Sequence, residues 1–129
     1  MFLDANIFIH AYHNRQIEGK ECGELLGRVR AGERAVTSPL VIAETTRFLE
    51  YHVGKDYAVR SSRNILGIPN LQILEIDKKT AELAINYFEQ GLEPHDAFHA
   101  ALMKQNGIQT ICSYDKDFDK IKEFKRKEP

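Results

Sequence analysis

Hydrophobic positions along the chain follow two periods, and the switches between them predict its elements. Short apolar or β-branched runs predict strands, and apolar residues three and four positions apart predict helices. We expect strands over residues 2–4, 35–38, 71–76 and 108–113, with a last short one near 121–124. We expect helices over residues 18–30, 39–53, 57–66, 78–90 and 93–106. The apolar run that opens with the first strand continues to Ile9, and we expect the strand itself to end at Asp4.

Capping residues support these boundaries. Ser38 precedes Pro39, and Asp77 precedes another expected helix, which are favoured residues for a helix start. Gly107 follows the last expected helix, where a left-handed residue commonly ends the turn. Strands that alternate with helices predict a single α/β domain over residues 1–129, with helices on both faces of a mostly parallel sheet. Such sheets bind ligands at the carboxyl ends of their strands.

Composition narrows the class of protein. The chain has 129 residues, 43% of them hydrophobic and 29% charged, as expected for a folded globular domain. No apolar run is long enough to span a bilayer, and no basic segment precedes the first apolar run, so we expect neither a membrane span nor a secretory signal. Two cysteines are too few for a disulfide scaffold, which favours buried thiols in a reducing cytoplasm. The net charge of −1 leaves nucleic-acid binding to local patches.

Four acidic residues fall where this fold gathers its ligands. Asp4 ends the first strand, Asp115 follows the strand that ends at Ser113, and Glu44 and Asp96 lie early in helices. Taken singly, each is an ordinary helix-start or turn residue. Asp4 and Glu44 lie in apolar segments, however, where a charge is costly to bury unless it is paired or binds a metal.

A cluster of carboxylates has a defined chemistry. Like charges in one pocket repel, which raises their pKa values unless a cation neutralises them. Oxygen ligands alone suit Mg²⁺ or Mn²⁺ rather than zinc. Such ions activate water and stabilise the leaving oxygen of a phosphodiester. The acids therefore predict a metal-dependent phosphodiesterase.

The motifs taken together resemble the PIN domain, and within it the VapC-type toxins of prokaryotic toxin–antitoxin pairs. The resemblance covers essentially the whole chain and rests on the order and spacing of four segments: Asp4-Ala5-Asn6-Ile7-Phe8, Glu44, Asp96-Ala97-Phe98-His99-Ala100-Ala101 and Ser113-Tyr114-Asp115-Lys116-Asp117-Phe118. It implies an α/β/α sandwich and a Mg²⁺- or Mn²⁺-dependent ribonuclease. It also implies an RNA substrate, a homodimer and a cognate antitoxin as partners.

The resemblance assigns roles to single residues. It implies that Asp4, Glu44 and Asp96 bind the metal and act in catalysis, with Asp115 as the fourth acid. Asp117 competes with Asp115 for that place. It implies that Asn6 and Ser113 orient the acids, and strand geometry would place Asn6 on the same face as Asp4. The family often has Thr where this chain has Ala5 and Ser113.

Two further features have open interpretations. Residues 120–127 hold five basic residues and one acid, and form either a solvated tail or an RNA-backbone patch that includes Lys122, Lys125, Arg126 and Lys127. His99 lies one helical turn after Asp96, where packing or hydrogen bonding is a more common role than metal binding.

Three alternative functions share part of this sequence pattern. A phosphatase of the haloacid-dehalogenase type also begins with a strand and an Asp, but it uses Asp-x-Asp, whereas this chain has Asp4-Ala5-Asn6. A PIN nuclease of RNA processing or decay needs the same acids without an antitoxin. A non-catalytic RNA- or protein-binding module on the same fold needs none of the four acids.

Overall fold

The computed structural model describes all residues, 1–129, and has one five-stranded sheet at its centre. The strands run in the order β3-β2-β1-β4-β5, and every neighbouring pair is parallel. Their bounds are β1 Phe2–Leu3, β2 Ala35–Thr37, β3 Leu71–Ile73, β4 Thr110–Cys112 and β5 Lys125–Lys127. The predicted sandwich with a mostly parallel central sheet is confirmed.

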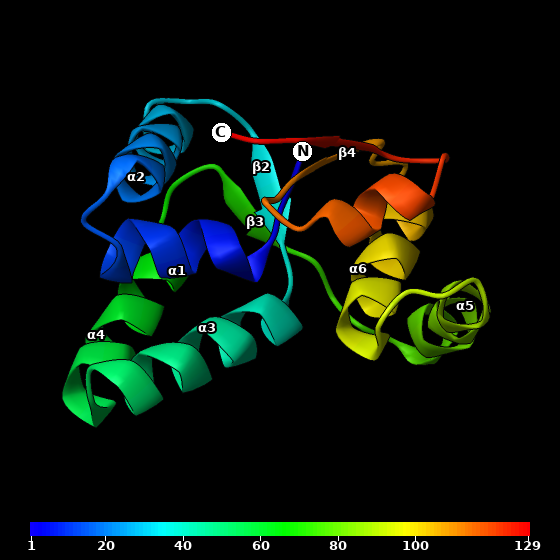
Figure 1. Cartoon of the computed structure of the whole chain (residues 1–129), viewed down its shortest axis with the longest axis horizontal. Helices are drawn as coiled ribbons and strands as arrows, with labels where there is room; N and C mark the ends of the chain where they lie inside the picture. Colours follow the sequence, from blue (N-terminus) through cyan, green and yellow to red (C-terminus); the bar gives the residue numbers. More distant parts are fainter.

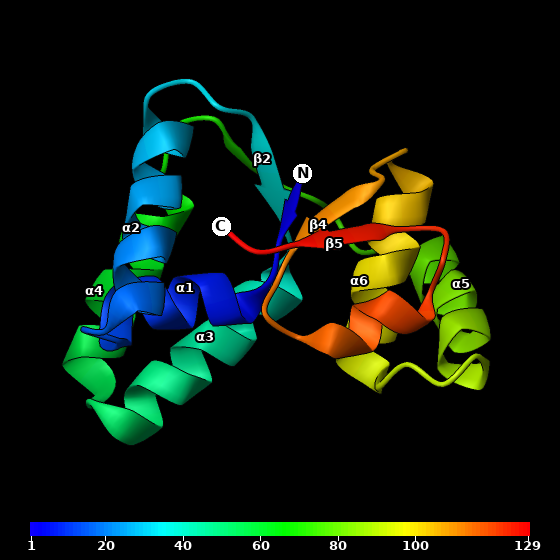
Figure 2. The ribbon, with the colours of Figure 1, turned by 45° about the horizontal axis from the view of Figure 1, so that its top comes forward.

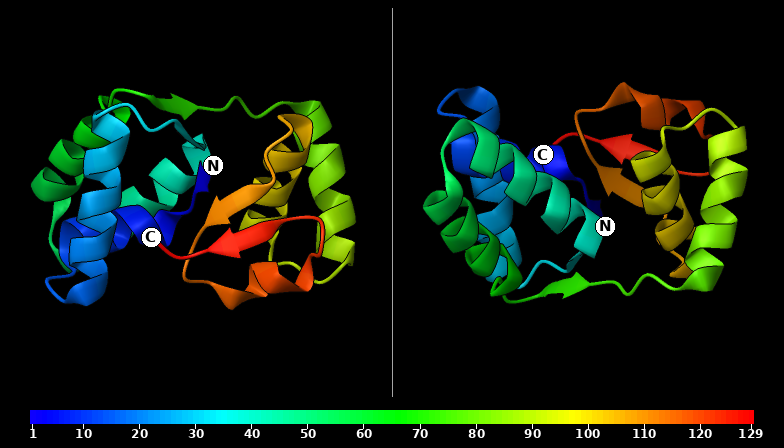
Figure 3. Two further views of the ribbon diagram at one scale, coloured as in Figure 1. Left: turned by 90° about the horizontal axis from the view of Figure 1, so that it is seen from above. Right: turned by 90° about the horizontal axis from the view of Figure 1, so that it is seen from below.

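Helices form a layer on each side of the sheet. Their bounds are α1 Ala5–His13, α2 Ile17–Arg30, α3 Pro39–His52, α4 Lys55–Leu66, α5 Lys78–Glu89 and α6 Pro94–Gln105, and a short 3₁₀ helix, η1, covers Lys116–Lys120. α1 packs on α2 and α3, and α3 packs on α4, whereas α5 packs on α6. Figures 1 and 3 show these two groups of helices with the strands between them. None of the helices is long and apolar enough to cross a membrane.

The central strand β1 carries the middle of the core. Phe2 pairs in register with Val36 of β2 and with Ile111 of β4. Phe2 and Leu3 are fully buried within a single hydrophobic cluster of 28 residues. Because β1 is only two residues long and has neighbours on both sides, the residue that follows it lies at the centre of the carboxyl edge of the sheet. That residue is Asp4.

The first helix, α1, was not predicted. The expected strand ends at Asp4 and no element was assigned to the apolar residues that follow it, but the chain turns into a helix at Ala5. The Asp4 side chain accepts a hydrogen bond from the Ala5 N–H, at 2.7 Å, and so caps that helix. Ile7 and Phe8 are buried on one face of it. A short apolar run reads equally well as strand or helix, and here tertiary packing decides. The strand argument that placed Asn6 beside Asp4 is therefore wrong.

The last strand was predicted four residues too early. Ile121 and Phe124 are buried in the core, but they belong to the turn that follows η1. β5 consists of the basic residues that come next, and it pairs with β4 at the edge of the sheet; Figure 2 shows it beside β4. The outer edge of an edge strand has unpaired backbone groups, and charged side chains are common there because they discourage pairing with other chains.

Candidate active site

A hydrogen-bond network fixes Asp4 at the end of β1. Its Oδ2 accepts from Asn6 Nδ2 at 2.7 Å and from Ser113 Oγ at 2.6 Å. Its Oδ1 accepts from the Ala5 N–H. Only 6% of Asp4 is exposed, so these donors replace most of the water that an exposed carboxylate would bind.

Asn6 and Ser113 also bond to each other and to the chain after β4. Asn6 Nδ2 donates to Ser113 Oγ at 2.8 Å, and Asn6 Oδ1 accepts from the Tyr114 N–H at 3.3 Å. Ser113 Oγ also accepts from the Asp115 N–H at 2.9 Å. The structure thus brings Asn6 to Asp4 through the first turn of α1, not along a strand. The network ties the segment that carries Asp115 to Asp4.

The remaining acids come from three separate elements. Glu44 lies in the second turn of α3, which begins after Ser38, whose Oγ caps the Val41 N–H at 3.3 Å. Asp96 lies in the first turn of α6, which begins at Pro94. Asp115 follows β4 and caps η1 through the Asp117 N–H at 2.8 Å. Figure 1 shows that α1 and α3 both begin at the same end of the strands.

Burial and mutual repulsion raise the pKa values of Asp4, Glu44 and Asp96. Burial is the main cause for Asp4, whose pKa rises to about 6, with Glu44 and Asp115 adding repulsion. The pKa of Asp96 rises to about 7, again through burial first and then through repulsion from Asp4, Asp115, Glu44 and Asp117. The pKa of Glu44 is also raised by burial, although the nearby His95 opposes that rise. The predicted acids therefore form one electrostatic group.

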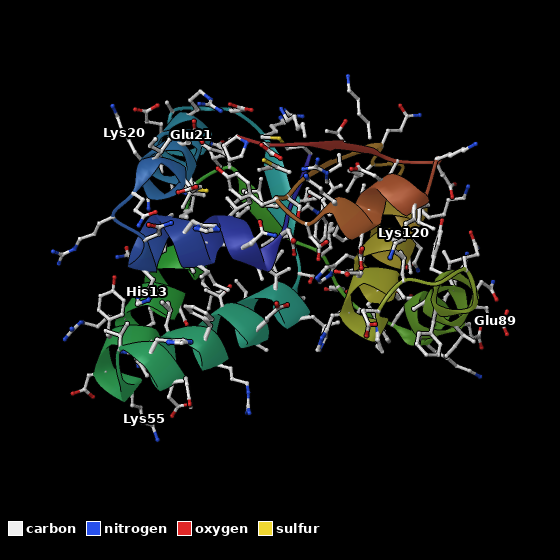
Figure 4. All side chains as sticks on the ribbon, in the orientation of Figure 1. His13, Lys20, Glu21, Lys55, Glu89 and Lys120 are labelled. Atoms are coloured by element: carbon white, nitrogen blue, oxygen red, sulfur yellow. The ribbon has the colours of Figure 1, made fainter.

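The two candidates for the fourth acid differ in their surroundings. Asp115 raises the pKa values of Asp4, Glu44 and Asp96. Of these three carboxyls, Asp117 raises the pKa of Asp96 only. Asp117 is also paired with Lys120, at 2.9 Å, so its charge is already partly neutralised. In Figure 4 the labelled Lys120 extends from the η1 segment.

The donor set fits a divalent cation by its chemistry. It consists of carboxylates, and no Lys or Arg is among the main causes of the raised pKa values of Asp4 and Asp96. Oxygen donors of this kind suit Mg²⁺ or Mn²⁺. No three His, Cys, Asp or Glu side chains stand close enough together to hold an ion at once.

One neighbour of Asp4 was not identified as such from the sequence. His99 is fully buried, and its Nε2 lies 3.8 Å from Asp4 Oδ1. Burial lowers the pKa of His99 to about 3, so the ring is neutral and the contact is not an ion pair. The signal available in the sequence was its position one helical turn after Asp96, which places both side chains on one face of α6.

The basic residues near the carboxyl end have two different environments. Lys122, Lys125 and Lys127 are exposed. Arg126 lies on the other face of β5, where its guanidinium bonds to Asp119, Glu128 and the backbone oxygen of Ser113. The predicted patch therefore reduces to three exposed lysines and one arginine that is already paired.

Comparisons with known proteins agree with this arrangement. The family model described as PIN domain matches residues 1–124. VapC20 of Mycobacterium tuberculosis, a sarcin–ricin loop cleaving toxin, superimposes with a TM-score of 0.79 at 20% identity, over 99% of this chain and 98% of that one. VapBC2 of Rickettsia felis, solved with a DNA fragment from its promoter, gives 0.74 at 17% identity, over 98% and 96%. A toxin–antitoxin complex from Klebsiella pneumoniae gives 0.70 at 17% identity, over 96% and 94%. No curated protein matches the sequence significantly.

Proposed function

The chain belongs to the PIN domain family, and we propose that it is a ribonuclease that hydrolyses RNA phosphodiester bonds with Mg²⁺ or Mn²⁺. The observation that carries this proposal is a group of mutually repelling carboxylates at the carboxyl edge of the sheet, in which Asp4 is buried and Asp96 half-buried. The pKa values are raised to about 6 for Asp4 and about 7 for Asp96. Such a group is costly to maintain without a cation.

The proposed metal-binding and catalytic residues are Asp4, Glu44, Asp96 and Asp115. We place Asp115 ahead of Asp117 because it acts electrostatically on the three other acids, and because Asp117 is paired with Lys120. When bound, a divalent cation supplies an activated water and neutralises charge that develops on the phosphate.

Other residues orient these acids. Asn6 and Ser113 hold Oδ2 of Asp4 by two hydrogen bonds, and the Ala5 N–H holds Oδ1. A carboxylate held in this way is already oriented, so little conformational entropy is lost when the substrate binds. Ser113 also binds the Asp115 N–H, so one hydroxyl positions two of the proposed metal-binding residues.

RNA cleavage is expected to disappear in EDTA and to return with Mg²⁺ or Mn²⁺ in excess. The reason is that carboxylates alone cannot neutralise the negative charge that develops on the five-coordinate phosphorus in the transition state. The measurement is gel-resolved cleavage of a labelled RNA at fixed protein concentration. Full cleavage in EDTA would refute the metal mechanism. A covalent aspartyl-phosphate trapped on Asp4 would instead support a phosphatase of the haloacid-dehalogenase type.

We also propose that the protein is the toxin of a toxin–antitoxin pair and acts as a homodimer. Two of the similar structures are a VapBC protein and a toxin–antitoxin complex. Large apolar side chains are exposed on α3 and α4 and at the turn between them: Tyr51, Val53, Val59 and Leu66. A surface of this kind suits a protein partner. A non-toxin role in RNA processing keeps the same chemistry and differs only in these partners.

The exposed lysines after η1 are proposed to contact the RNA backbone. Changing Lys122, Lys125 and Lys127 together to Ala is expected to flatten the salt dependence of RNA binding. Each phosphate contact with a single strand contributes roughly 0.7 to the slope of log K against log salt, so three lost contacts flatten it by about 2. The measurement is a salt titration of RNA binding in Ca²⁺, in which cleavage should be slow.

The control is a triple variant with the same charge change elsewhere. Lys20, Lys55 and Lys78 are exposed lysines on α2, α4 and α5, and their replacement by Ala leaves β5 intact. Lys20 and Lys55 are labelled in Figure 4, far from Lys120. Equal slopes for the two variants would show that the lysines of residues 120–127 do not contact RNA. The exposed arginines of α3 and α4, which are Arg47, Arg60 and Arg63, would then be the alternative contacts.

A further inference from the structure

His99 is a buried polar side chain without a hydrogen-bond partner. It is 0% exposed, and neither ring nitrogen bonds to any protein group. Thr45 Oγ1 is the one other buried side-chain polar atom in this condition. A buried donor left unpaired costs free energy that an apolar side chain of similar size does not. Packing alone therefore does not explain why a histidine occupies this position.

One nitrogen of the His99 ring lies close to one carboxylate oxygen of Asp4. Its Nε2 lies 3.8 Å from Asp4 Oδ1, and the ring of Phe2 packs beside it with centroids 5.2 Å apart. A hydrogen bond requires about 3.2 Å or less, so a movement of under about 1 Å would complete one. The two residues come from different layers, because Asp4 follows β1 and His99 lies on α6.

Asp4 has an acceptor site open on that side. Oδ2 already accepts from Asn6 and Ser113, whereas Oδ1 accepts from the Ala5 N–H alone. Each oxygen of a carboxylate has about two acceptor sites. A neutral imidazole with its proton on Nε2 is the donor that this oxygen lacks.

We propose that His99 is a positioning residue for Asp4, to which it presents Nε2–H and whose carboxylate it fixes for metal binding. The proposal rests on the proposed metal-dependent function. Groups that hold a metal-ligating side chain in this way commonly change metal affinity when they are removed. His99 itself touches neither the metal nor the RNA in this role.

The tautomer of His99 tests the geometry directly. In protein labelled with ¹⁵N-histidine, the nitrogen shifts of His99 should show a neutral ring with the proton on Nε2. Addition of Mg²⁺, which is diamagnetic, should shift the Nε2 resonance more than that of Nδ1. A proton on Nδ1 with Nε2 bare would overturn the proposal, since that ring has no donor facing Asp4. This measurement uses the unmodified protein and needs no variant to fold.

Metal affinity tests the consequence. His99→Leu removes the donor and keeps an apolar filling, whereas His99→Gln retains an N–H near the position of Nε2. We expect His99→Leu to weaken Mn²⁺ binding about 10- to 100-fold by calorimetry, and His99→Gln to recover most of that loss. The Tm of metal-free His99→Leu should equal or exceed that of the wild type, because an unpaired polar group has gone.

The control is Met103→Leu, a conservative change at another fully buried position of α6. It should leave Mn²⁺ affinity unchanged. If His99→Leu binds Mn²⁺ as the wild type does, His99 serves packing alone and the inference is wrong. If the wild type itself binds neither Mn²⁺ nor Mg²⁺, the proposed function fails instead, and the ¹⁵N shifts still report whether His99 faces Asp4 with its proton. The two failures are therefore distinguishable.

Discussion

Replacing Asp96 with Asn is expected to abolish RNA cleavage while the fold is retained. Loss of one proposed metal-binding carboxylate removes on the order of 4 kcal/mol of transition-state stabilisation, which is about a thousandfold in rate. The amide has the same shape, so the first turn of α6 should keep its packing. Folding should even improve without metal, because burial and repulsion raise the pKa of Asp96 to about 7 and its ionised form is disfavoured. The measurement pairs single-turnover cleavage with urea unfolding in EDTA.

Asp56 provides a matched control for this variant. It lies in the first turn of α4, as Asp96 lies in the first turn of α6, and it is exposed. Asp56→Asn makes the same chemical change at the same kind of helix position outside the carboxylate group. It should leave cleavage unchanged. Cleavage by Asp96→Asn at the rate of Asp56→Asn would remove Asp96 from the site.

Much of the fold could be predicted because local signals and packing agree. Ser38 and Asp77 cap the helices predicted to follow them, through the N–H groups of Val41 and Thr80. Gly107 has a positive φ of 65° after α6, as its predicted place required. Such signals depend on a few neighbouring residues, so they can be read without knowledge of the tertiary structure.

Other features depend on contacts that no local pattern records. The chain after Asp4 becomes a helix because α1 packs against α2 and α3, which a run of apolar residues does not specify. β5 follows Phe124 because Ile121 and Phe124 fill the core from a turn, leaving the basic residues to pair with β4. The short approach of His99 to Asp4 depends on how α6 lies across the end of β1. Each of these is a long-range outcome.

In the candidate site too, some features follow from local sequence signals and others depend on long-range contacts. That Asp4, Glu44, Asp96 and Asp115 influence one another electrostatically was predictable, because the ends of parallel strands and the helices that follow them share one edge of the sheet. How they are held was not. The contact of Asn6 with Asp4 was predicted on a strand geometry that does not exist, and it arises instead from the first turn of α1. The preference for Asp115 over Asp117 depends on the pairing of Asp117 with Lys120.

Without metal, the stability advantage of Asp96→Asn should grow with pH. In the folded wild type the pKa of Asp96 is about 7, whereas in the unfolded chain it is near 3.8. Between these values the folded state holds a proton that the unfolded state has released, so wild-type stability falls as pH rises through the window. From about pH 5 to pH 7 this amounts to about 2 kcal/mol, because the full slope of 1.36 kcal/mol per pH unit falls to about half as the pH reaches the folded pKa. Asn does not titrate, so the Asp96→Asn variant loses none of this stability as the pH rises.

The difference between the two proteins isolates this effect from the other titrating groups. Asp4, with its pKa near 6, gives a slope of the same sign, and His99, with its pKa lowered to about 3, gives the opposite one. Both remain in the variant, so they largely cancel when the unfolding free energies are subtracted. Urea unfolding in EDTA at about pH 5, 6, 7 and 8 measures the subtraction. Saturating Mg²⁺ should reverse the advantage, because a bound cation favours the ionised wild-type carboxylate. Parallel curves for Asp96→Asn and wild type across this range would show that Asp96 is not held among repelling acids.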